Sequence, residues 1–530
     1  MAGSVLIAGS VLIAGGGPVG LMLACELRLA GVRTVVAERL PRRTGQSRAL
    51  GLHARTVEVL DQRGLLDRFR EGAPVWPTAH FAGLRLLDLS RLDGNHTYAL
   101  MVPQSRTEEI LAGRAIELGC EIRYGHEVVG LCQDADGVDV TVRGPDGTGR
   151  WRVSYLVGCD GGGSAVRKLS RIDFPGTAST MSALLGDVRL AQEQPAGPQL
   201  RRMTGGLFGV VPLDSGYHRV VTVEFRSRPP CAVVTLDELR AAVERVTGTA
   251  LEMSQPRWLS RFGNATRQAA RYRAGRVLLA GDAAHVHFPA GGQGLNTGMQ
   301  DAVNLGWKLA ATVHGWAPAG LLDTYHDERH PVAAQVCHNT RAQLALMDPA
   351  EEITPLRELF AELMDLPQVN RHLAGMITGV DLRYDMPTPG DERHPLLGRR
   401  LPDLPLQVRG RSVRAVHLLR SGRGLLLDLT GDLDRTGDAA VWAACGGWAD
   451  RVDVVGAQCG TQPPADALLV RPDGYVAWVG GAAGSAAGSG PGSLEDALTT
   501  WFGTRREEQP CPTYCTSTPR PAAPARSPGN

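Results

Sequence analysis

Residues 276–309 read RVLLAGDAAHVHFPAGGQGLNTGMQDAVNLGWKL, and this stretch decides the fold that we expect. It opens with a short aliphatic run, residues 277–280, as buried strands do, and it becomes helical from about Leu295 onward. Asp282 follows the strand, so its carboxylate is expected at the carboxyl edge of a sheet, where open α/β sheets bind their ligands. The stretch therefore predicts a strand, a ligand loop and a helix.

The loop between strand and helix is rich in glycine, which lets a large flat ligand touch the backbone. Its candidate ligand contacts are Pro289, Gly291, Gly292 and Gly294. We expect Gly294, Leu295 and Asn296 to present free N–H groups at the start of the helix, where the dipole favours a negative charge on the ligand. An anionic ring fits this loop, although a strand-to-helix turn without a ligand explains the loop alone equally well.

The N-terminal region supplies a second ligand loop. An apolar run, residues 10–14, leads into the spacing GxGxxG and then into a helical stretch at 21–30. The glycines of the motif are Gly15, Gly17 and Gly20. They permit a tight turn, the close approach of a pyrophosphate and contact between helix and strand. A second strand at 33–37 ends in Glu38, where an acid accepts hydrogen bonds from a ribose, so the order of elements predicts a dinucleotide site.

A third strand-to-loop transition lies between these two. The apolar run 155–158 is followed by Cys159-Asp160-Gly161 and then by GGSAVR at 162–167. An Asp-Gly pair after a strand is most often only a turn, so this motif gains its meaning from the other two.

Together the three motifs resemble the fingerprints of the FAD-dependent aromatic hydroxylases, the para-hydroxybenzoate hydroxylase-like flavoprotein monooxygenases. The resemblance rests on GGGPVG with Glu38, on CDGGGSAVR and on RVLLAGDAAHVHFPAGGQGLN. Further stretches are similar to the bacterial hydroxylases that tailor aromatic polyketides, the angucycline type especially: Glu38-Arg39, Ser47-Arg48, and residues 102–104, 262–268 and 372–376.

The resemblance implies a bound FAD and a transient nicotinamide donor, NADPH. The FAD contacts that it implies are the glycine motif with Glu38 and Arg39, Arg48, Gln104, Asp160, Asp282, and Gly294 to Asn296. The donor is expected near Asp160, where relatives more often carry an arginine in place of Gly163 and Arg167 is the remaining basic residue. The choice between NADPH and NADH stays open.

Composition excludes several other classes of function. The 530 residues carry 56 basic and 55 acidic side chains, a formal charge of +1, which argues against nucleic acid or an anionic membrane as partner. The ten cysteines lack metal-ligand spacing, and most fall in apolar runs, which indicates free thiols in a reducing cytoplasm. His285 and His287 alone do not make a metal site. We find no uninterrupted apolar segment of roughly 18 residues, the length that a membrane span requires.

The chain is long enough for several domains, and we expect an α/β (α+β) fold of three. A Rossmann-like FAD-binding domain takes residues 1–175 and 262–390, with 77–102 contributing to a β-sheet substrate domain at 176–261. A thioredoxin-like domain follows at 396–503, where Cys445 and Cys459 stand alone without a CxxC pair. A disordered tail, 504–530, ends the chain. The hexapeptide SVLIAG occurs twice, at 4–9 and 10–15, and we expect only the second copy to be the native strand.

The candidate pocket walls are aromatic residues of the predicted substrate domain and of the segment beside it. They are Phe208, Phe225, Trp258, Trp76, Phe81 and His80, and ordinary core packing explains each of them as well.

The resemblance implies a single-component monooxygenase that hydroxylates a polycyclic, angucyclinone-like polyketide with NADPH and O2, through a C4a-hydroperoxyflavin, in antibiotic biosynthesis. We expect no catalytic nucleophile, and the catalytic base is not identified. A Baeyer–Villiger insertion on a related polyketide and a non-catalytic FAD-binding protein remain as alternatives. The sequence leaves self-association as a homodimer open.

Overall fold

The structure is a computed structural model that describes residues 5–6, 10–84, 86–193, 197–227, 233–386, 394–430, 446–480 and 492–506. Some of the sequence predictions fall outside these residues. They concern most of the first SVLIAG copy, residues 387–393 of the boundary before the third domain, Cys445, and residues 507–530 of the tail.

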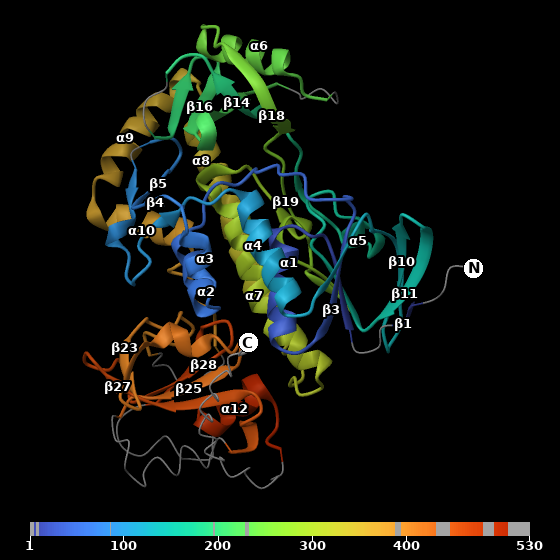
Figure 1. Cartoon of the computed structure of the whole chain (residues 1–530). Coiled ribbons are helices and arrows are strands. Elements are labelled where there is room, and N and C mark those ends of the chain that lie inside the picture. Colours follow the sequence, from blue (N-terminus) through green and yellow to red (C-terminus); the bar gives the residue numbers. More distant parts are fainter. Residues whose placement is uncertain are drawn as a thin grey trace, which may run out of the picture.

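A six-stranded sheet forms the centre of the first domain (Figure 1). Its order is β20 (Arg273–Ala274), β21 (Val277–Leu279), β12 (Tyr155–Gly158), β2 (Ser10–Ala14), β3 (Arg33–Glu38) and β8 (Glu121–Tyr124). All neighbours pair in parallel except β20 and β21. The aliphatic runs of β2, β12 and β21 are fully buried, as strands covered on both faces require.

Three helices pack side by side against this sheet. They are α1 (Pro18–Leu29), α4 (Gln104–Glu117) and α7 (Gln293–Val313). The other layer is a four-stranded sheet with the short helix α5 (Ala165–Leu169). Its strands are β1 (Val5–Leu6), β11 (Gly147–Val153), β10 (Val138–Gly144) and β9 (Glu127–Gln133). The second SVLIAG copy is therefore the first strand of the nucleotide-binding sheet, as predicted, while Val5–Leu6 of the first copy pairs at the edge of this other sheet.

A second sheet of five antiparallel strands lies at the top of Figure 1. Its order is β15 (Gln199–Met203), β16 (Gly206–Pro212), β17 (Tyr217–Glu224), β14 (Ser182–Leu190) and β18 (Met253–Phe262). Helix α6 (Leu236–Thr247) packs on its outer face, and its inner face turns to the ligand loop of the first domain. We call it the substrate sheet.

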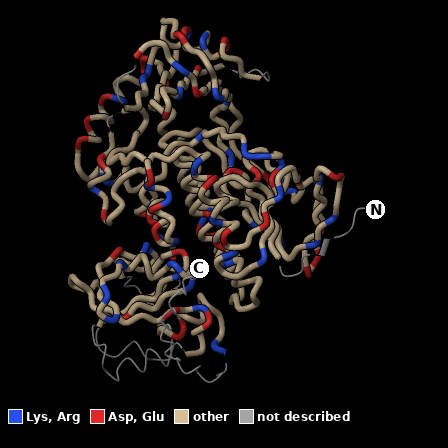
Figure 2. The backbone as a smooth tube through the Cα atoms, viewed as in Figure 1, with Lys and Arg blue, Asp and Glu red and all other residues tan. Residues whose placement is uncertain are grey.

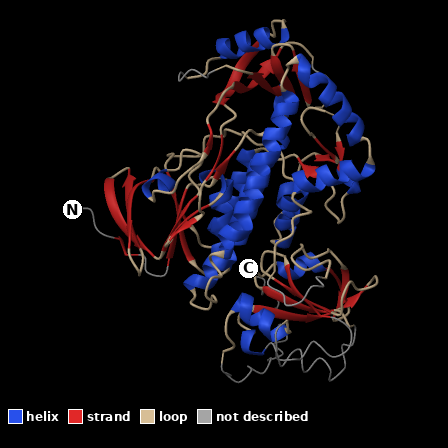
Figure 3. Cartoon of the chain, turned by 180° about the vertical axis from the view of Figure 1, so that it is seen from behind, coloured by secondary structure: helices blue, strands red, loops and turns tan. Residues whose placement is uncertain are grey.

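Short elements connect the two sheets. They are α2 (Ala54–Gln62), α3 (Leu66–Arg70), the ribbons of β4 (Val75–Trp76) with β7 (Ala99–Leu100) and of β5 (Thr78–Ala79) with β6 (Leu87–Asp88), and the sheet of β13 (Gly176–Thr177), β19 (Thr266–Gln268) and β22 (His285–Val286). The chain then continues through α8 (Thr324–Met347), α9 (Thr354–Met364) and α10 (Pro367–Thr378). Helix α8 runs from the first domain up to the substrate sheet (Figure 3).

The C-terminal unit has a mixed four-stranded sheet, consistent with the predicted thioredoxin-like fold. The order is β26 (Val452–Gly456), β25 (Gly424–Asp428), β28 (Ala467–Val470) and β29 (Val476–Gly480), with only β25 and β26 parallel. A three-stranded sheet of β24 (Arg411–Arg414), β23 (Pro405–Val408) and β27 (Gln458–Cys459) and helix α12 (Leu494–Phe502) complete it.

Buried charges join this unit to the first domain. The guanidinium of Arg471 donates to both carboxylate oxygens of Glu328 on α8, at 2.6 and 2.8 Å, and Lys308 on α7 lies 2.9 Å from the same carboxylate. Burial lowers the pKa of the Lys308 ammonium to about 8. Asp473 balances the second cation, so the four charges sum to zero in a place without solvent.

Two features bear on the surroundings of the protein. Basic and acidic residues are interspersed along the described part of the backbone tube (Figure 2). None of the described helices is both long and apolar enough to cross a bilayer.

Candidate functional site

Strand register brings the three predicted loops to one edge of the central sheet. Ala14 of β2 is paired with Gly158 of β12 and with Ala37 of β3, and Gly158 is paired with Leu279 of β21. This edge therefore carries Glu38, the last residue of β3, beside the residues that follow the other three strands, which are Gly15 to Gly17, Asp160 and Asp282. This is the carboxyl edge, where ligands of open α/β sheets bind.

The three glycines of the first loop have different roles. Gly15 has a φ of +109°, and a Cβ there would lie 2.4 Å from the carbonyl oxygen of Cys159. A Cβ at Gly20 would lie 2.1 Å from the carbonyl oxygen of Gly15. Gly17 has no protein atom within 4 Å of its Cβ position and begins α1 without a side-chain cap. Gly15 and Gly20 thus need glycine for folding, whereas the open space beside Gly17 lets a ligand approach the backbone at the start of α1.

Glu38 closes the same loop from the neighbouring strand. Its Oε2 accepts a hydrogen bond of 2.7 Å from the Gly16 N–H, and its Oε1 accepts one of 2.9 Å from the Leu40 N–H. The carboxylate is thereby fixed beside the glycine turn, as a ribose contact requires.

Asp160 and Arg167 serve the local structure of the second loop. The Asp160 carboxylate accepts hydrogen bonds from the Ser164 hydroxyl and from the N–H groups of Ala165 and Val166, so it caps α5. Arg167 is buried and donates to the carbonyl oxygens of Gly162 and Ala283. Arg167, the remaining basic residue near the expected donor, thus ties the second loop to the third through its guanidinium.

The third loop leaves Asp282 free to act. Asp282 lies in the single turn η3 (Gly281–Ala283), is exposed, and makes no hydrogen bond or ion pair within the described part of the chain. Gly291 and Gly292 adopt φ values of +66° and +65° in the turn before α7, and no side chain caps this helix. The helix starts at Gln293, so Gly294 and Leu295 lie in its first turn.

A fully buried carboxylate holds this loop in place. Asp301 accepts hydrogen bonds from the Gly281 N–H at 3.2 Å, from His285 Nε2 at 2.8 Å and from Arg329 Nε at 2.7 Å. Burial alone would raise the pKa of Asp301, but the charges of Arg329 and His285 keep it below its usual value. The sequence does not indicate this group, because Asp301 on α7 and Arg329 on α8 meet only in the folded protein. His285 belongs to this structural group, and in the described residues no cluster of three or more His, Cys, Asp or Glu side chains could hold a metal ion.

The Asn296 side chain is hydrogen-bonded within the protein. Its Oδ1 accepts from the His53 N–H at 2.8 Å, and its Nδ2 donates to the carbonyl oxygens of Gly51 and Gly292. It therefore joins the segment before α2 to α7, and only its backbone stays near the start of the helix.

His53 makes this junction sensitive to acid. Its Nδ1 lies 3.1 Å from the carbonyl oxygen of Ile377, and burial lowers the pKa of the imidazole from 6.5 to about 4. Below pH 6.5 the unfolded chain takes up a proton that the folded chain refuses, so stability falls as the pH drops from 6.5 to 4. We expect the His53 imidazole to lower the free energy of unfolding by about 3 kcal/mol between pH 6.5 and pH 4. Urea unfolding should show that the free energy of unfolding of the wild type, relative to that of His53→Asn, falls by this amount between pH 6.5 and pH 4. A difference between the two proteins that does not depend on pH would contradict this prediction.

The remaining predicted cofactor residues lie around the first loop. Arg39 and Arg48 are exposed, and neither guanidinium has a hydrogen-bond partner among the described residues. Gln104 is the first residue of α4, and its Nε2 donates to Glu108 at 2.9 Å. Arg39 and Arg48 are thus free for a phosphate, whereas the Gln104 amide is engaged at both ends, because its Oε1 accepts a hydrogen bond of 3.3 Å from the Ala49 N–H.

An apolar cluster lies between the substrate sheet and the third loop, and we call it the inner cluster. It contains Phe81, Ala183, Leu207, Val223, Phe288, Ala290 and Ile377, with Phe225 packed against it. Phe225 therefore lies on the inner face of the substrate sheet, and its role as a pocket wall stays a prediction. Phe208 does not lie on this face, because neighbouring residues of a strand face opposite ways and its ring packs on the outer face with α6. Trp76 lies half buried in the β4–β7 ribbon, outside this cluster.

A buried ion pair connects the substrate sheet with the segment that carries Arg48. Asp187 accepts from Arg219 Nε at 2.8 Å and from Trp258 Nε1 at 2.8 Å. The same guanidinium donates to the carbonyl oxygens of Ser47 and of Arg48, the latter at 2.8 Å. The Arg219 and Asp187 side chains are 3% and 5% exposed. The pair thus fastens one domain to the other directly beside the candidate cofactor site.

A parallel sheet with a glycine turn, an acid on the next strand and two further loops at one edge defines a dinucleotide-binding protein. Residues 9–340 match the model of the FAD binding domain, and residues 394–504 match the aromatic-ring hydroxylase C-terminal model. The chain belongs to this family of FAD-binding proteins, which confirms the resemblance found in the sequence.

Similar proteins span nearly the whole chain. A Streptomyces rimosus protein named 12-dehydrotetracycline 5-monooxygenase/anhydrotetracycline 6-monooxygenase is 51% identical, covering 92% of this chain and 98% of that protein. The structure of CabE, an aromatic hydroxylase from angucycline biosynthesis, superimposes with a TM-score of 0.85 at 46% identity, covering 94% of this chain and 99% of CabE. PyrE3, a Diels-Alderase in the biosynthetic pathway of pyrroindomycins, reaches 0.79 at 42% identity, covering 93% and 99%.

Proposed function

We propose that the chain is a single-component FAD-dependent monooxygenase that uses NADPH and O2 to hydroxylate a polycyclic aromatic polyketide in antibiotic biosynthesis. The observation that carries this proposal is the likeness, over almost the whole chain, to a tetracycline monooxygenase and an angucycline hydroxylase. The FAD site that all three loops form supports it from the side of the structure.

The candidate cofactor residues have different proposed contacts with FAD, according to their positions. Gly17 and Glu38 would take the pyrophosphate and ribose of FAD, Arg48 and Asp282 its middle, and the first turn of α7 the anionic edge of the flavin ring. When bound, FAD supplies the hydride acceptor and the activated oxygen. The inner cluster would keep water away from the reacting atoms, which matters because water competes with the transfer of oxygen to the ring. No nucleophile is required.

We also assign each predicted domain to one of these roles. We assign residues 1–175 with 262–390 to FAD, 176–261 with 77–102 to the substrate, and 396–503 to structural support. NADPH would bind transiently and reduce the flavin, without a separate nucleotide-binding domain in the protein. We place the chain in the cytoplasm, as the free thiols of Cys25 and Cys120 favour. A homodimer would form through the exposed Leu356, Leu359, Leu363 and Leu366.

Asp282→Ala should weaken FAD retention about tenfold, because the exposed carboxylate has no role in folding and one charge-assisted hydrogen bond is worth roughly that factor. Equilibrium dialysis measures it. Asp327→Ala, an exposed acid in the first turn of α8, is the control. Full flavin content in the purified Asp282 variant would remove this residue from the site.

Anaerobic mixing with NADPH tests the proposed function. We expect NADPH to bleach the flavin faster with an angucyclinone-type phenol than without it, and oxygen then to give a hydroxylated product. A lactone of the same mass, found by NMR, would instead assign a Baeyer–Villiger insertion.

A second candidate function has its own support. The fold likeness to a Diels-Alderase at 42% identity favours a protein that holds FAD without using it for oxidation. The geometry of the three loops supports FAD binding, which this second function requires as well. Flavin that NADPH reduces more slowly than any turnover, with and without the phenol, would favour it.

A further inference from the structure

Three buried amide side chains link the inner cluster to the third loop. The Ala82 N–H donates to Gln343 Oε1 at 3.1 Å, and Gln343 Nε2 donates to Asn339 Oδ1 at 3.4 Å. Asn339 Nδ2 then donates to Gln293 Oε1 at 3.2 Å, and Gln293 Nε2 donates to the carbonyl oxygen of Ala290 at 3.2 Å. We call Gln343, Asn339 and Gln293 the amide chain. All four hydrogen bonds run in one direction, from a backbone donor to a backbone acceptor.

The two ends of the amide chain belong to different functional parts. Ala82 follows Phe81 in the inner cluster, on the segment that contributes to the substrate domain. Ala290 and Gly291 form the turn that leads into α7. A Cβ at Gly291 would lie 3.4 Å from Gln343 Nε2 and from Gln293 Nε2, so the amides also pack against this turn directly.

Burial makes this arrangement costly unless every amide is paired. Gln343, Asn339 and Gln293 are 0, 5 and 2% exposed, and none of their polar atoms lacks a partner. Apolar side chains would fill the same space without that constraint. Because each amide both accepts and donates, a shift at one end changes the hydrogen bonds at the other.

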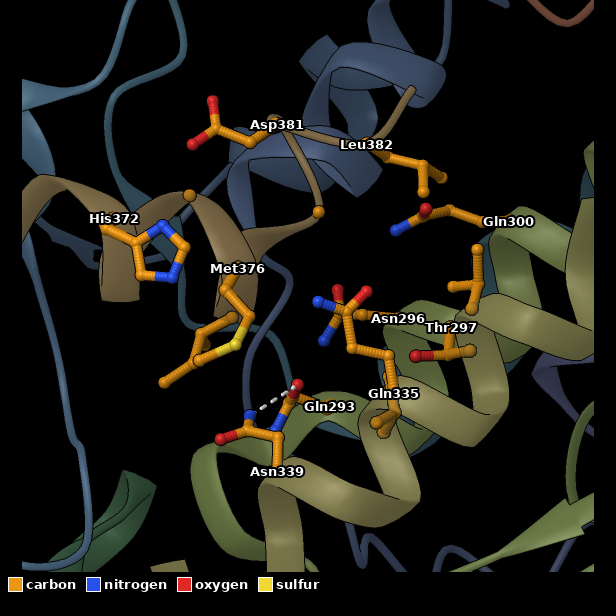
Figure 4. A pocket seen from close by; sticks show the side chains of 15 residues that line it. Gln293, Asn296, Thr297, Gln300, Gln335, Asn339, His372, Met376, Asp381 and Leu382 are labelled. Atoms are coloured by element: carbon orange, nitrogen blue, oxygen red, sulfur yellow. Dashed lines mark hydrogen bonds between the residues drawn. The ribbon is translucent and has the colours of Figure 1, made fainter. Parts of the chain in front are cut away.

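The amide chain borders a cavity on one side. Gln293 and Asn339 line a cavity of about 180 Å³ between α7, α8 and α10, and their hydrogen bond crosses its floor (Figure 4). The Gln335 and Gln300 side chains, which also face this cavity, make no hydrogen bond within the described residues. The amide chain is thus bounded on one side by space rather than by packed side chains.

We propose that Gln343, Asn339 and Gln293 are positioning residues that set the Ala290–Gly292 turn of the cofactor loop according to the Ala82 segment of the substrate domain. The inference rests on the proposed function for the identity of the ligand at the turn. In this proposal the three amide side chains act on the flavin through the backbone of Ala290.

Hydrogen exchange in Gln343→Leu tests the proposal, with and without FAD. Loss of the acceptor should speed exchange at Ala82 in any account. The amide chain further predicts about tenfold faster exchange at Gly292, whose N–H donates to the Pro289 carbonyl oxygen, because one net hydrogen bond is worth about that factor. FAD affinity should fall about fivefold. Asn339→Leu should give the same pattern, and the double variant no more than either single one.

Thr340→Val is the matched control. Thr340 is equally buried on α8, but its hydroxyl bonds only to carbonyl oxygens of its own helix, so Gly292 should keep the exchange rate of the wild type. Faster exchange at Ala82 with an unchanged rate at Gly292 would overturn the proposal, whether or not the protein binds FAD. Failure of the wild type to bind FAD would instead contradict the proposed function, and the exchange result in the FAD-free protein would still stand.

Discussion

Gly17→Val should abolish FAD binding while the protein keeps its fold. The Cβ position of Gly17 meets no protein atom within 4 Å, and its φ of −79° is open to any residue. A valine there costs the folded state about 1 kcal/mol, as a poor residue for a helix start. The same side chain would occupy the place of the pyrophosphate, so we expect FAD affinity to fall at least about a hundredfold, or about 3 kcal/mol.

Flavin fluorescence titration and thermal unfolding of the same samples measure the two quantities. Gly113→Val is the control, because Gly113 on α4 is equally open and lies far along the chain from the loop. Gly20→Val is a useful contrast, because a Cβ there meets the Gly15 carbonyl and should impair folding itself. A Gly17 variant that keeps its flavin would show that the ligand does not lie on this loop.

Arg219→Met should cost about 3 to 5 kcal/mol of folding free energy, because it leaves the Asp187 carboxylate buried without a counter-charge. It also frees the carbonyl oxygens of Ser47 and Arg48, so the segment beside the cofactor site loses its hold on the substrate sheet. We expect the surviving folded protein to bind FAD more weakly as well.

Urea unfolding separates the ion pair from its environment. Asp187→Leu combined with Arg219→Met should be more stable than Arg219→Met alone, since no unpaired charge remains. Arg226→Met is the control, because Arg226 is 74% exposed in its ion pair with Asp348 and should contribute less than about 1 kcal/mol. Equal losses for Arg219 and Arg226 would contradict the account.

Much of the fold could be read from the sequence because its signals are local. The strands that end before Gly15, Asp160 and Asp282 are short aliphatic runs, and each is followed at once by its loop residues. Helix α6 begins and ends at local signals, since a Thr235 cap and Gly248 mark its ends. The family resemblance then supplied the order of the domains.

The sequence could not reveal the residues that hold the loops. Asp301 with Arg329, Asp187 with Arg219, and the amide chain from Gln343 join elements that meet only in the folded protein. Buried polar residues on α8 look like an ordinary polar helix face until their partners are known. The misplacement of Phe208 was avoidable, because strand alternation beside Leu207 assigns the two side chains to opposite faces.

Mass spectrometry of the product formed under ¹⁸O₂ tests the central claim most directly. Purified protein with its FAD, NADPH and an angucyclinone-type phenol should give a product that carries one ¹⁸O atom, formed in step with NADPH consumption. The Gly17→Val protein should give none. A substrate that comes back unlabelled, or a rearranged product of unchanged mass formed without NADPH, would contradict the monooxygenase account.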